Sequence, residues 1–278
     1  MKSFLFALLL LSSASSFGQY YYKDIIGTKE TSGQMKTYKA QGVSRVVLNS
    51  FDQNNVRNDQ FYVEQQFIPA TQTLRTLTRT DDMDPSVLVS FLDANGNVIQ
   101  TIDSSEAVIS TTFYRYDGNG KLITVESTTV DSSGRSSLSE KHIWEYNGAQ
   151  VSRMLRIKNQ RDTVFVSFKT DSKGNISEEQ EVHKGIASEP VYYYYDDAGR
   201  LTDIVRYNTK AKRLLPEYMF EYSATNQVIQ KITVPSNSDN YLIWRYQFDN
   251  KGLKTKEVIY DKHKQVTGKI EYQYVFGS

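Results

Sequence analysis

Aromatic and polar residues alternate along most of the chain from about residue 86 onward. In a stretch such as Trp144-Glu145-Tyr146, every second side chain is aromatic or β-branched and its neighbours are mostly polar. A period of two predicts antiparallel strands with one buried face. After residue 18 we find no sustained apolar period of 3.6 residues, which argues against most α/β enzyme folds.

A turn motif separates these strands. Asp-x-x-Gly, followed two residues later by an apolar residue, recurs about every 25 residues, a distance that holds two strands and two turns. The Asp can accept backbone amides and the Gly can take a positive φ, so we expect tight hairpin loops with Gly120 and Gly199 at positive φ. The turns begin at positions 93, 117, 147, 171, 196, 223 and 249.

The repeat predicts an all-β fold, an up-and-down antiparallel meander of about 16–20 short strands. Open sheets rarely exceed about 10 strands, and a flat one would expose a large aromatic patch. We therefore expect the sheet to roll into a barrel, a spiral or a two-layer sandwich. The alternative is a flat sheet that binds through its aromatic face. The residues expected to face inward are Tyr116, Trp144, Phe168, Phe220, Trp244 and Tyr246.

Residues 1–18 have the features of a signal peptide. Lys2 precedes an apolar run over residues 4–11, and cleavage after Gly18 would leave Gln19 first. The run is shorter than the roughly 20 residues that span a bilayer. We expect a periplasmic or secreted protein, without a lipid anchor because the chain has no cysteine. Residues 19–85 are expected to form a strand-rich capping section and residues 86–278 the hairpin repeats.

Charge and composition limit the partners. Loss of Lys2 with the leader leaves 32 basic and 32 acidic residues, a balance that argues against nucleic acid and anionic membranes as partners. The 20 Tyr and 13 Phe, with only 5 Pro, favour strands.

Two of the turn units resemble a known repeat. Residues 195–202, Tyr-Asp-Asp-Ala-Gly-Arg-Leu-Thr, are similar to the YD-repeat (RHS-repeat) motif nearly letter for letter, and residues 116–122 are close to it. The resemblance covers roughly residues 86–275, although other copies keep only the turn. It implies strand-turn-strand units in a curling sheet on bacterial surface or secreted proteins, often with carbohydrate or cell-surface binding. The chain is too short for the toxin-enclosing shells of that family.

No catalytic, cofactor or metal motif stands out. His142, His183 and His263 lie on three different repeats, and His142 falls on the aromatic face, where a packed imidazole is expected. Nucleophile elbows, zinc-binding pairs and phosphate-binding glycine loops do not occur in the sequence. We therefore expect no catalytic, cofactor-binding or metal-binding residues.

Four consecutive tyrosines, residues 192–195, interrupt the alternation. Tyr192 and Tyr194 should lie on the face opposite the aromatic ladder, where tyrosine offers a large contact area to a ligand at low entropic cost. They are the candidate ligand-contacting residues. The alternative is that both faces of this strand are buried.

The sequence thus favours an exported, non-enzymatic binding or scaffold protein that contacts a glycan or an envelope component and needs no cofactor. The alternative is an outer-membrane β-barrel, which amphipathic strands of this length could build, although charges on the outward face and short turns oppose it. A glycan-active enzyme has the weaker support of abundant carboxylates.

Overall fold

A computed structural model describes residues 20–80, 83–105, 107–131, 133–134, 137–235 and 238–277. The expected signal peptide, residues 1–18, lies outside the described residues, so export stays a prediction.

The described residues form two helices and 19 strands. The helices are α1 (Lys23–Ala40) and the 3-10 helix η1 (Pro69–Thr71). The strands are β1 (Val43–Asp52), β2 (Arg57–Ile68), β3 (Thr73–Thr80), β4 (Met83–Leu92), β5 (Val98–Ser104), β6 (Val108–Tyr116), β7 (Leu122–Asp131), β8 (Ser137–Asn147), β9 (Gln150–Lys158), β10 (Asp162–Thr170), β11 (Ile176–His183), β12 (Ile186–Ala187), β13 (Val191–Tyr195), β14 (Leu201–Asn208), β15 (Arg213–Tyr222), β16 (Val228–Thr233), β17 (Leu242–Phe248), β18 (Lys254–Tyr260) and β19 (Val266–Phe276).

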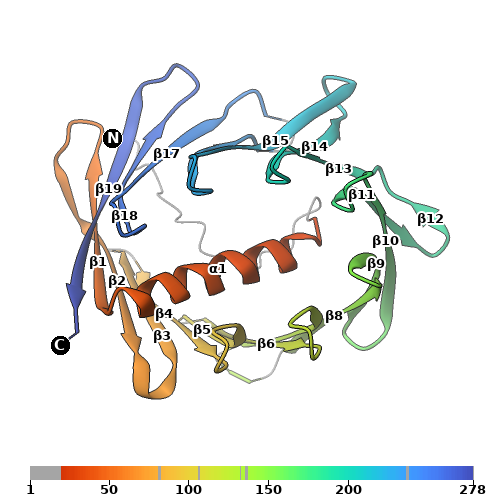
Figure 1. Ribbon diagram of the computed structural model, residues 1–278, viewed down its shortest axis with the longest axis horizontal. Coiled ribbons are helices and arrows are strands. Elements are labelled where there is room, and N and C mark those ends of the chain that lie inside the picture. Colours follow the sequence, from red (N-terminus) through yellow and green to blue (C-terminus); the bar gives the residue numbers. More distant parts are fainter. Residues whose placement is uncertain are drawn as a thin grey trace.

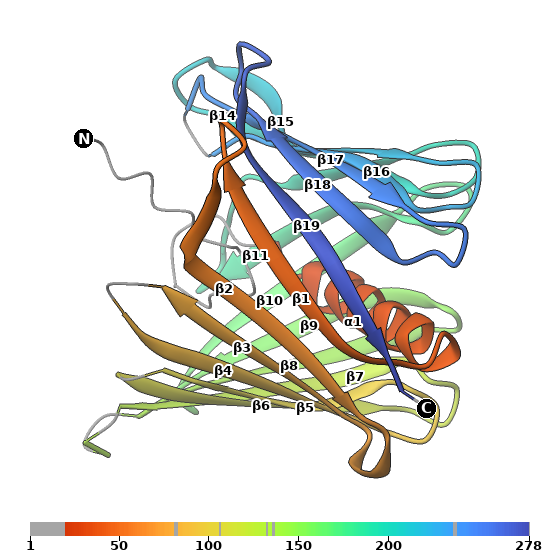
Figure 2. The same ribbon diagram turned by 90° about the vertical axis from the view of Figure 1, so that its left-hand side faces the viewer.

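The strands form one antiparallel meander that closes into a barrel (Figures 1 and 2). Each strand except β12 pairs with the next along the chain. β1 pairs with both β2 and β19, from Val43 opposite Phe276 to Asp52 opposite Gly268 in the ladder with β19. The two-residue β12 and the following β13 both pair with β11, so the wall has 18 positions. The predicted all-β meander is confirmed, and of the three ways to close it the barrel is the one observed.

Helix α1 lies inside the barrel and crosses its lumen (Figure 1). The sequence pattern did not predict this helix, because residues 19–85 were expected to contain strands. Its buried positions do follow a helical period, namely Ile25, Thr28, Ser32, Met35 and Tyr38. Two of these five are small hydroxyl residues, which leaves no apolar stripe for a hydrophobicity pattern to detect.

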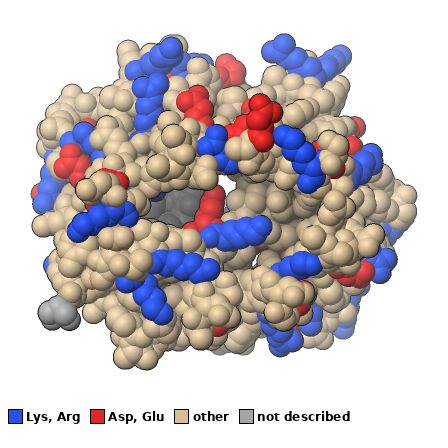
Figure 3. All heavy atoms as spheres, viewed as in Figure 1, with Lys and Arg blue, Asp and Glu red and all other residues tan. Residues whose placement is uncertain are grey.

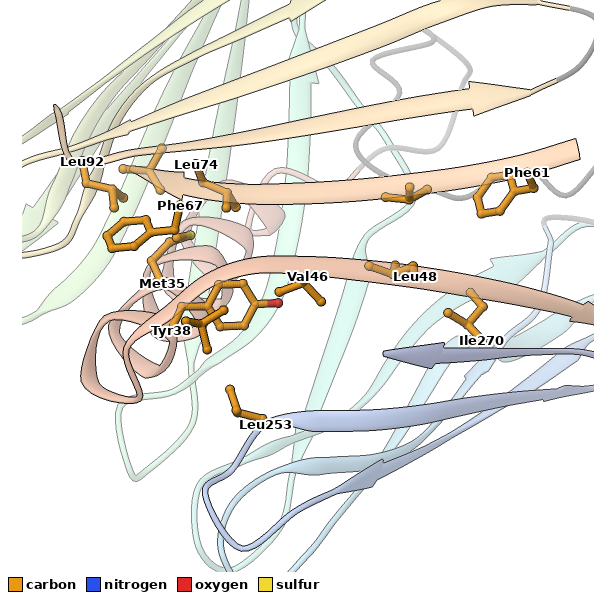
Figure 4. Close-up of a cluster of buried hydrophobic side chains, with 13 residues drawn as sticks. Met35, Tyr38, Val46, Leu48, Phe61, Phe67, Leu74, Leu92, Leu253 and Ile270 are labelled. Atoms are coloured by element: carbon orange, nitrogen blue, oxygen red, sulfur yellow. The ribbon is translucent and has the colours of Figure 1, made fainter. Parts of the chain in front are cut away.

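The helix packs against opposite parts of the wall at its two ends. Near its C-terminal end, Met35 and Tyr38 pack on β1, β2 and β4, with Val46, Phe67 and Leu92 among their neighbours (Figure 4). Near its N-terminal end, a second cluster combines these residues: Tyr21, Ile25, Leu122, Val125, Trp144, Met154, Val164 and Val166.

The aromatic face of the sheet therefore lies inside, as predicted. Trp144 is 3% exposed and stacks on Phe168 with ring centroids 5.4 Å apart. Trp244 is half-buried and pairs across strands with Ile259, which is 1% exposed. Closure of the wall excludes the flat sheet with an open aromatic face.

The hairpin turns at one end of the barrel have the predicted geometry. Gly120 and Gly199 both have φ of +76°. In the first of these turns, Asp117 Oδ1 accepts the N–H groups of Asn119 at 2.9 Å and Lys121 at 2.8 Å, while Gly120 donates to the Asp117 carbonyl. One carboxylate thus satisfies two amides that would otherwise lack partners at the tip.

Tyrosine hydroxyls link neighbouring hairpins at this same end. The ladder between β5 and β6 stops at Gln100 and Phe113, before either strand reaches its turn. Tyr116 bridges this gap by donating its hydroxyl to the Val98 carbonyl at 2.9 Å. Three further hydroxyls donate to the residue two positions after the turn glycine of the preceding hairpin: Tyr146 to Leu122, Tyr222 to Leu201 and Tyr274 to Lys254.

Tyr195 occupies the equivalent position before its turn, but its hydroxyl has no hydrogen-bond partner among the described residues, although it is buried. Replacing Tyr116, Tyr146 or Tyr222 by Phe should therefore lower the free energy of unfolding by about 0.5–1.5 kcal/mol, whereas Tyr195→Phe should be neutral or stabilising. Urea denaturation of the four variants measures this. If Tyr195→Phe lowered the free energy of unfolding as much as the other three variants do, the assigned hydrogen bonds of the tyrosine hydroxyls would be contradicted.

The turn glycines can be tested within a single loop. Gly120 and Gly118 both have open space where a Cβ would be added, but a positive φ is found at Gly120 and not at Gly118. We expect Gly120→Val to cost about 1–3 kcal/mol because its backbone becomes strained. Thermal unfolding of Gly118→Val, the matched control, should show a clearly smaller loss.

Candidate functional site

The two tyrosines singled out by the sequence lie on the outer surface of the barrel. Tyr193, which alternates with them on β13, faces the lumen and is 3% exposed, whereas Tyr194 is 50% exposed. Tyr192 is half-buried. Both line an open groove of about 400 Å³ together with Asp171, Lys173, Ser177 and Glu178. The structure thus brings the predicted pair together on one outward groove.

The groove lies where two strands separate. The ladder between β11 and β13 consists of Glu178 opposite Tyr192 and Glu179 opposite Val191. Beyond these pairs the tips of the two hairpins diverge and leave the groove between them. Glu178 is paired with Lys169 at 2.7 Å, so its carboxylate is already engaged. The groove offers aromatic contact and hydrogen bonding, but no arrangement typical of a nucleophile or a general base.

A second group of residues anchors the N-terminal end of α1 to the wall. The Glu179 carboxylate, 2% exposed, accepts the backbone N–H groups of Tyr21 and Tyr22 at 2.8 and 2.9 Å. It also accepts the hydroxyl of Tyr193 at 2.8 Å. Burial raises the pKa of Glu179, while these donors oppose that shift. A buried acid that is bonded in this way fixes where the helix begins.

His142 completes this anchor from β8. Its Nδ1 lies 2.5 Å from Asp24 on α1 and its Nε2 lies 2.9 Å from Glu140, which also accepts from Arg156. Burial lowers the pKa of His142, but the Asp24 and Glu140 carboxylates outweigh it and raise the pKa to about 9. The hydrogen bond from His142 lowers the pKa of Glu140 to about 2. The imidazole is packed, as predicted, and serves as a cation between two acids.

A third group lines the open part of the lumen. Figure 3 shows that the end of the barrel is hollowed on one side of the central helix, with acidic and basic side chains at the rim. On the wall, Lys254 pairs with Glu257 at 2.7 Å, and Glu257 also accepts the hydroxyl of Tyr272. Glu30 on α1 interacts electrostatically with Lys231 and Lys254.

The sequence did not reveal this lumenal group. Its members come from α1 and from strands far along the chain, and their meeting depends on a helix inside a closed wall. One feature of the sequence could have indicated this group: Lys231, Lys254 and Glu257 occupy positions that the alternation assigns to the inward, aromatic face.

Among the described residues, no group of three or more His, Asp and Glu side chains could hold a metal ion. In the same part of the chain, no helix is long and apolar enough to cross a membrane.

No family model matches the chain, and no curated protein matches it. Solved structures with some similarity include the TcdB2-TccC3-Cdc42 complex, at 15% identity over 78% of this chain with a TM-score of 0.34. A Photorhabdus luminescens Tc holotoxin pore matches at 14% identity over 78% with a TM-score of 0.34. This chain spans 12% of the length of each of those two chains.

A porin-like protein from Bacteroides uniformis matches at 11% identity, over 84% of this chain and 98% of that one, with a TM-score of 0.39. At these identities and TM-scores the similarities indicate neither a family nor an activity for this chain.

The helix anchor predicts a specific dependence on pH. The pKa of His142 rises from 6.5 to about 9 on folding, so its contribution to stability is complete below about pH 6.5 and is lost as the pH rises through 9. Between these pH values the free energy of unfolding of wild type should fall by up to about 3 kcal/mol more than that of His142→Gln. Urea denaturation of wild type and His142→Gln between pH 6 and about 10 measures the difference. If the free energies of unfolding of wild type and His142→Gln depended on pH in the same way, the ion pairs of His142 with Asp24 and Glu140 would be contradicted.

Proposed function

We propose that this protein is an exported, non-enzymatic β-barrel that binds a glycan or another component of the cell envelope. One observation carries the proposal: the closed wall encloses a lumen that its own helix fills only in part (Figures 1 and 3). The inward positions of β15–β18 include aromatic and charged residues such as Trp244, Lys231 and Glu257. Barrels of this width can enclose ligand cavities or channels. The similarity of residues 195–202 to the YD-repeat motif supports the same assignment.

The outer surface favours a barrel surrounded by water. Ion pairs link neighbouring strands on the outside of the wall, where they alternate with inward residues such as Val63, Val125 and Trp144. Each Arg or Lys side chain facing lipid would cost about 2–4 kcal/mol at the middle of a bilayer, and each Asp or Glu somewhat less. The pairs are Arg45–Glu64, Lys141–Glu126, Arg153–Glu145 and Lys169–Glu178.

An outer-membrane barrel is the second candidate, and closure of the wall is the observation that favours it. The pairing of β1 with β19 removes both sheet edges, which a membrane barrel requires. Several strands also have the length of about 9–11 residues that spans a bilayer, among them β1 with 10 residues and β8 with 11. Large apolar side chains such as Phe113, Phe165 and Leu214 are exposed between the charges.

Cell fractionation separates the two candidates. We expect the mature protein in the periplasm or the medium, because its outward charges prefer water. Retention in the outer-membrane pellet after a carbonate wash, with heat-modifiable migration in gels, would instead support the membrane barrel. Binding is tested on a glycan array with the purified protein, and recovery of intact glycans after prolonged incubation tests the absence of enzymatic activity.

A further inference from the structure

The lumenal face of α1 carries an acidic residue that water reaches. Glu30 is exposed although the wall surrounds the helix, and it is not among the α1 residues, such as Ile25 and Met35, that are buried. Its charge acts on Tyr222 and Tyr246 as well as on Lys231 and Lys254, which places it toward β15–β18.

Two charges in this space have no partner of opposite sign in contact. Lys254 and Glu257 bond to each other. Glu30 and Lys231, in contrast, make no hydrogen bond and no ion pair with any described residue, although the two charges interact electrostatically. Lys231 lies over the ring of Tyr218, 5.4 Å from its centroid. Lys231 is half-buried and burial lowers its pKa, whereas water reaches the carboxylate of Glu30.

Aromatic rings flank these charges at fixed positions. Lys231 is opposite Phe220 on one side and opposite Trp244 on the other, so the three side chains form a row across β15, β16 and β17. In the next row, Tyr246 is opposite Glu257. Trp244 and Tyr246 are half-buried and thus offer ring surface to the lumen.

We propose that the space between α1 and β15–β18 is a saccharide-binding subsite. A sugar ring would stack on Trp244 or Tyr246, and its hydroxyl groups would donate to Glu30 and accept from Lys231. The two acids and two bases balance, so the subsite favours a neutral ligand over a polyanion or polycation. A sugar combines an apolar face with many hydroxyls, which matches aromatic rings beside unpaired polar groups. This inference rests on the proposed glycan-binding function and gives it a location.

Titration calorimetry of the purified mature protein with maltotriose, cellotriose and chitotriose tests the subsite. Glu30→Gln and Lys231→Gln should each weaken binding of the recognised sugar by about tenfold or more, because each loses a hydrogen bond to a charged group. The matched controls are Glu178→Gln and Tyr194→Ala in the outer groove, which should bind like wild type. Equal thermal midpoints confirm that the lumenal variants remain folded. Bound sugar should also protect Trp244 from acrylamide quenching.

The outcomes separate the two levels of the hypothesis. Binding that is lost in Tyr194→Ala but kept in Glu30→Gln and Lys231→Gln would move the site to the outer groove, overturning the inference while the proposed function stands. The protein could instead bind a glycyl dipeptide but no sugar, with binding that depends on Glu30 and Lys231. That outcome would support the position of the subsite and would overturn the assignment of its ligand as a saccharide. Absence of wild-type binding both to these sugars and on the glycan array would refute the proposed function itself.

Discussion

A wall of eighteen strands encloses a lumen that is too wide for its own inward side chains to fill. Small barrels fill their interior with their own side chains, but wider ones cannot. Here the inward side chains are largely aromatic, and an empty lumen would leave them against water. Helix α1 meets this constraint by packing Met35 and Tyr38 on one part of the wall and Ile25 on another. The aromatic face can therefore be a core without a second sheet to cover it.

The helix is held by polar contacts as much as by apolar ones. Glu179 bonds to the backbone at its start, and Asp24 reaches His142 and Trp144 on the wall. Such contacts add little net stability over an apolar packing of the same shape, because each buried charge must first lose its water. They do define one position along the lumen, since a helix shifted by one turn would remove the Tyr21 and Tyr22 amides from buried Glu179 and Asp24 from buried His142. That fixed position determines where Glu30 faces the opposite wall.

The local fold was readable from the sequence and its closure was not. Turn residues such as Asp117 and Gly120 act within four positions, so their spacing predicted the hairpins directly. Whether the meander rolls into a barrel depends on β1 meeting β19, and neither strand carries a local signal for that pairing. The sequence pattern did not predict helix α1 because Thr28 and Ser32 occupy buried positions where apolar residues would have indicated an amphipathic helix. Among the candidate ligand contacts, Tyr192 and Tyr194 stood out because they interrupt the alternation, whereas Glu30 and Lys231 depend on tertiary structure.

Closure by the first and last strands has a consequence for how the protein folds. Val43 pairs with Phe276, so the final ladder cannot form until nearly the whole chain has been synthesised. Until then β1 presents an unpaired edge and the lumen is open along one side. Pairings of such high contact order are slow, and an open edge during the delay invites association with other chains. A chaperone that shields the free edge of β1 would therefore act on the step that limits the yield of native barrel.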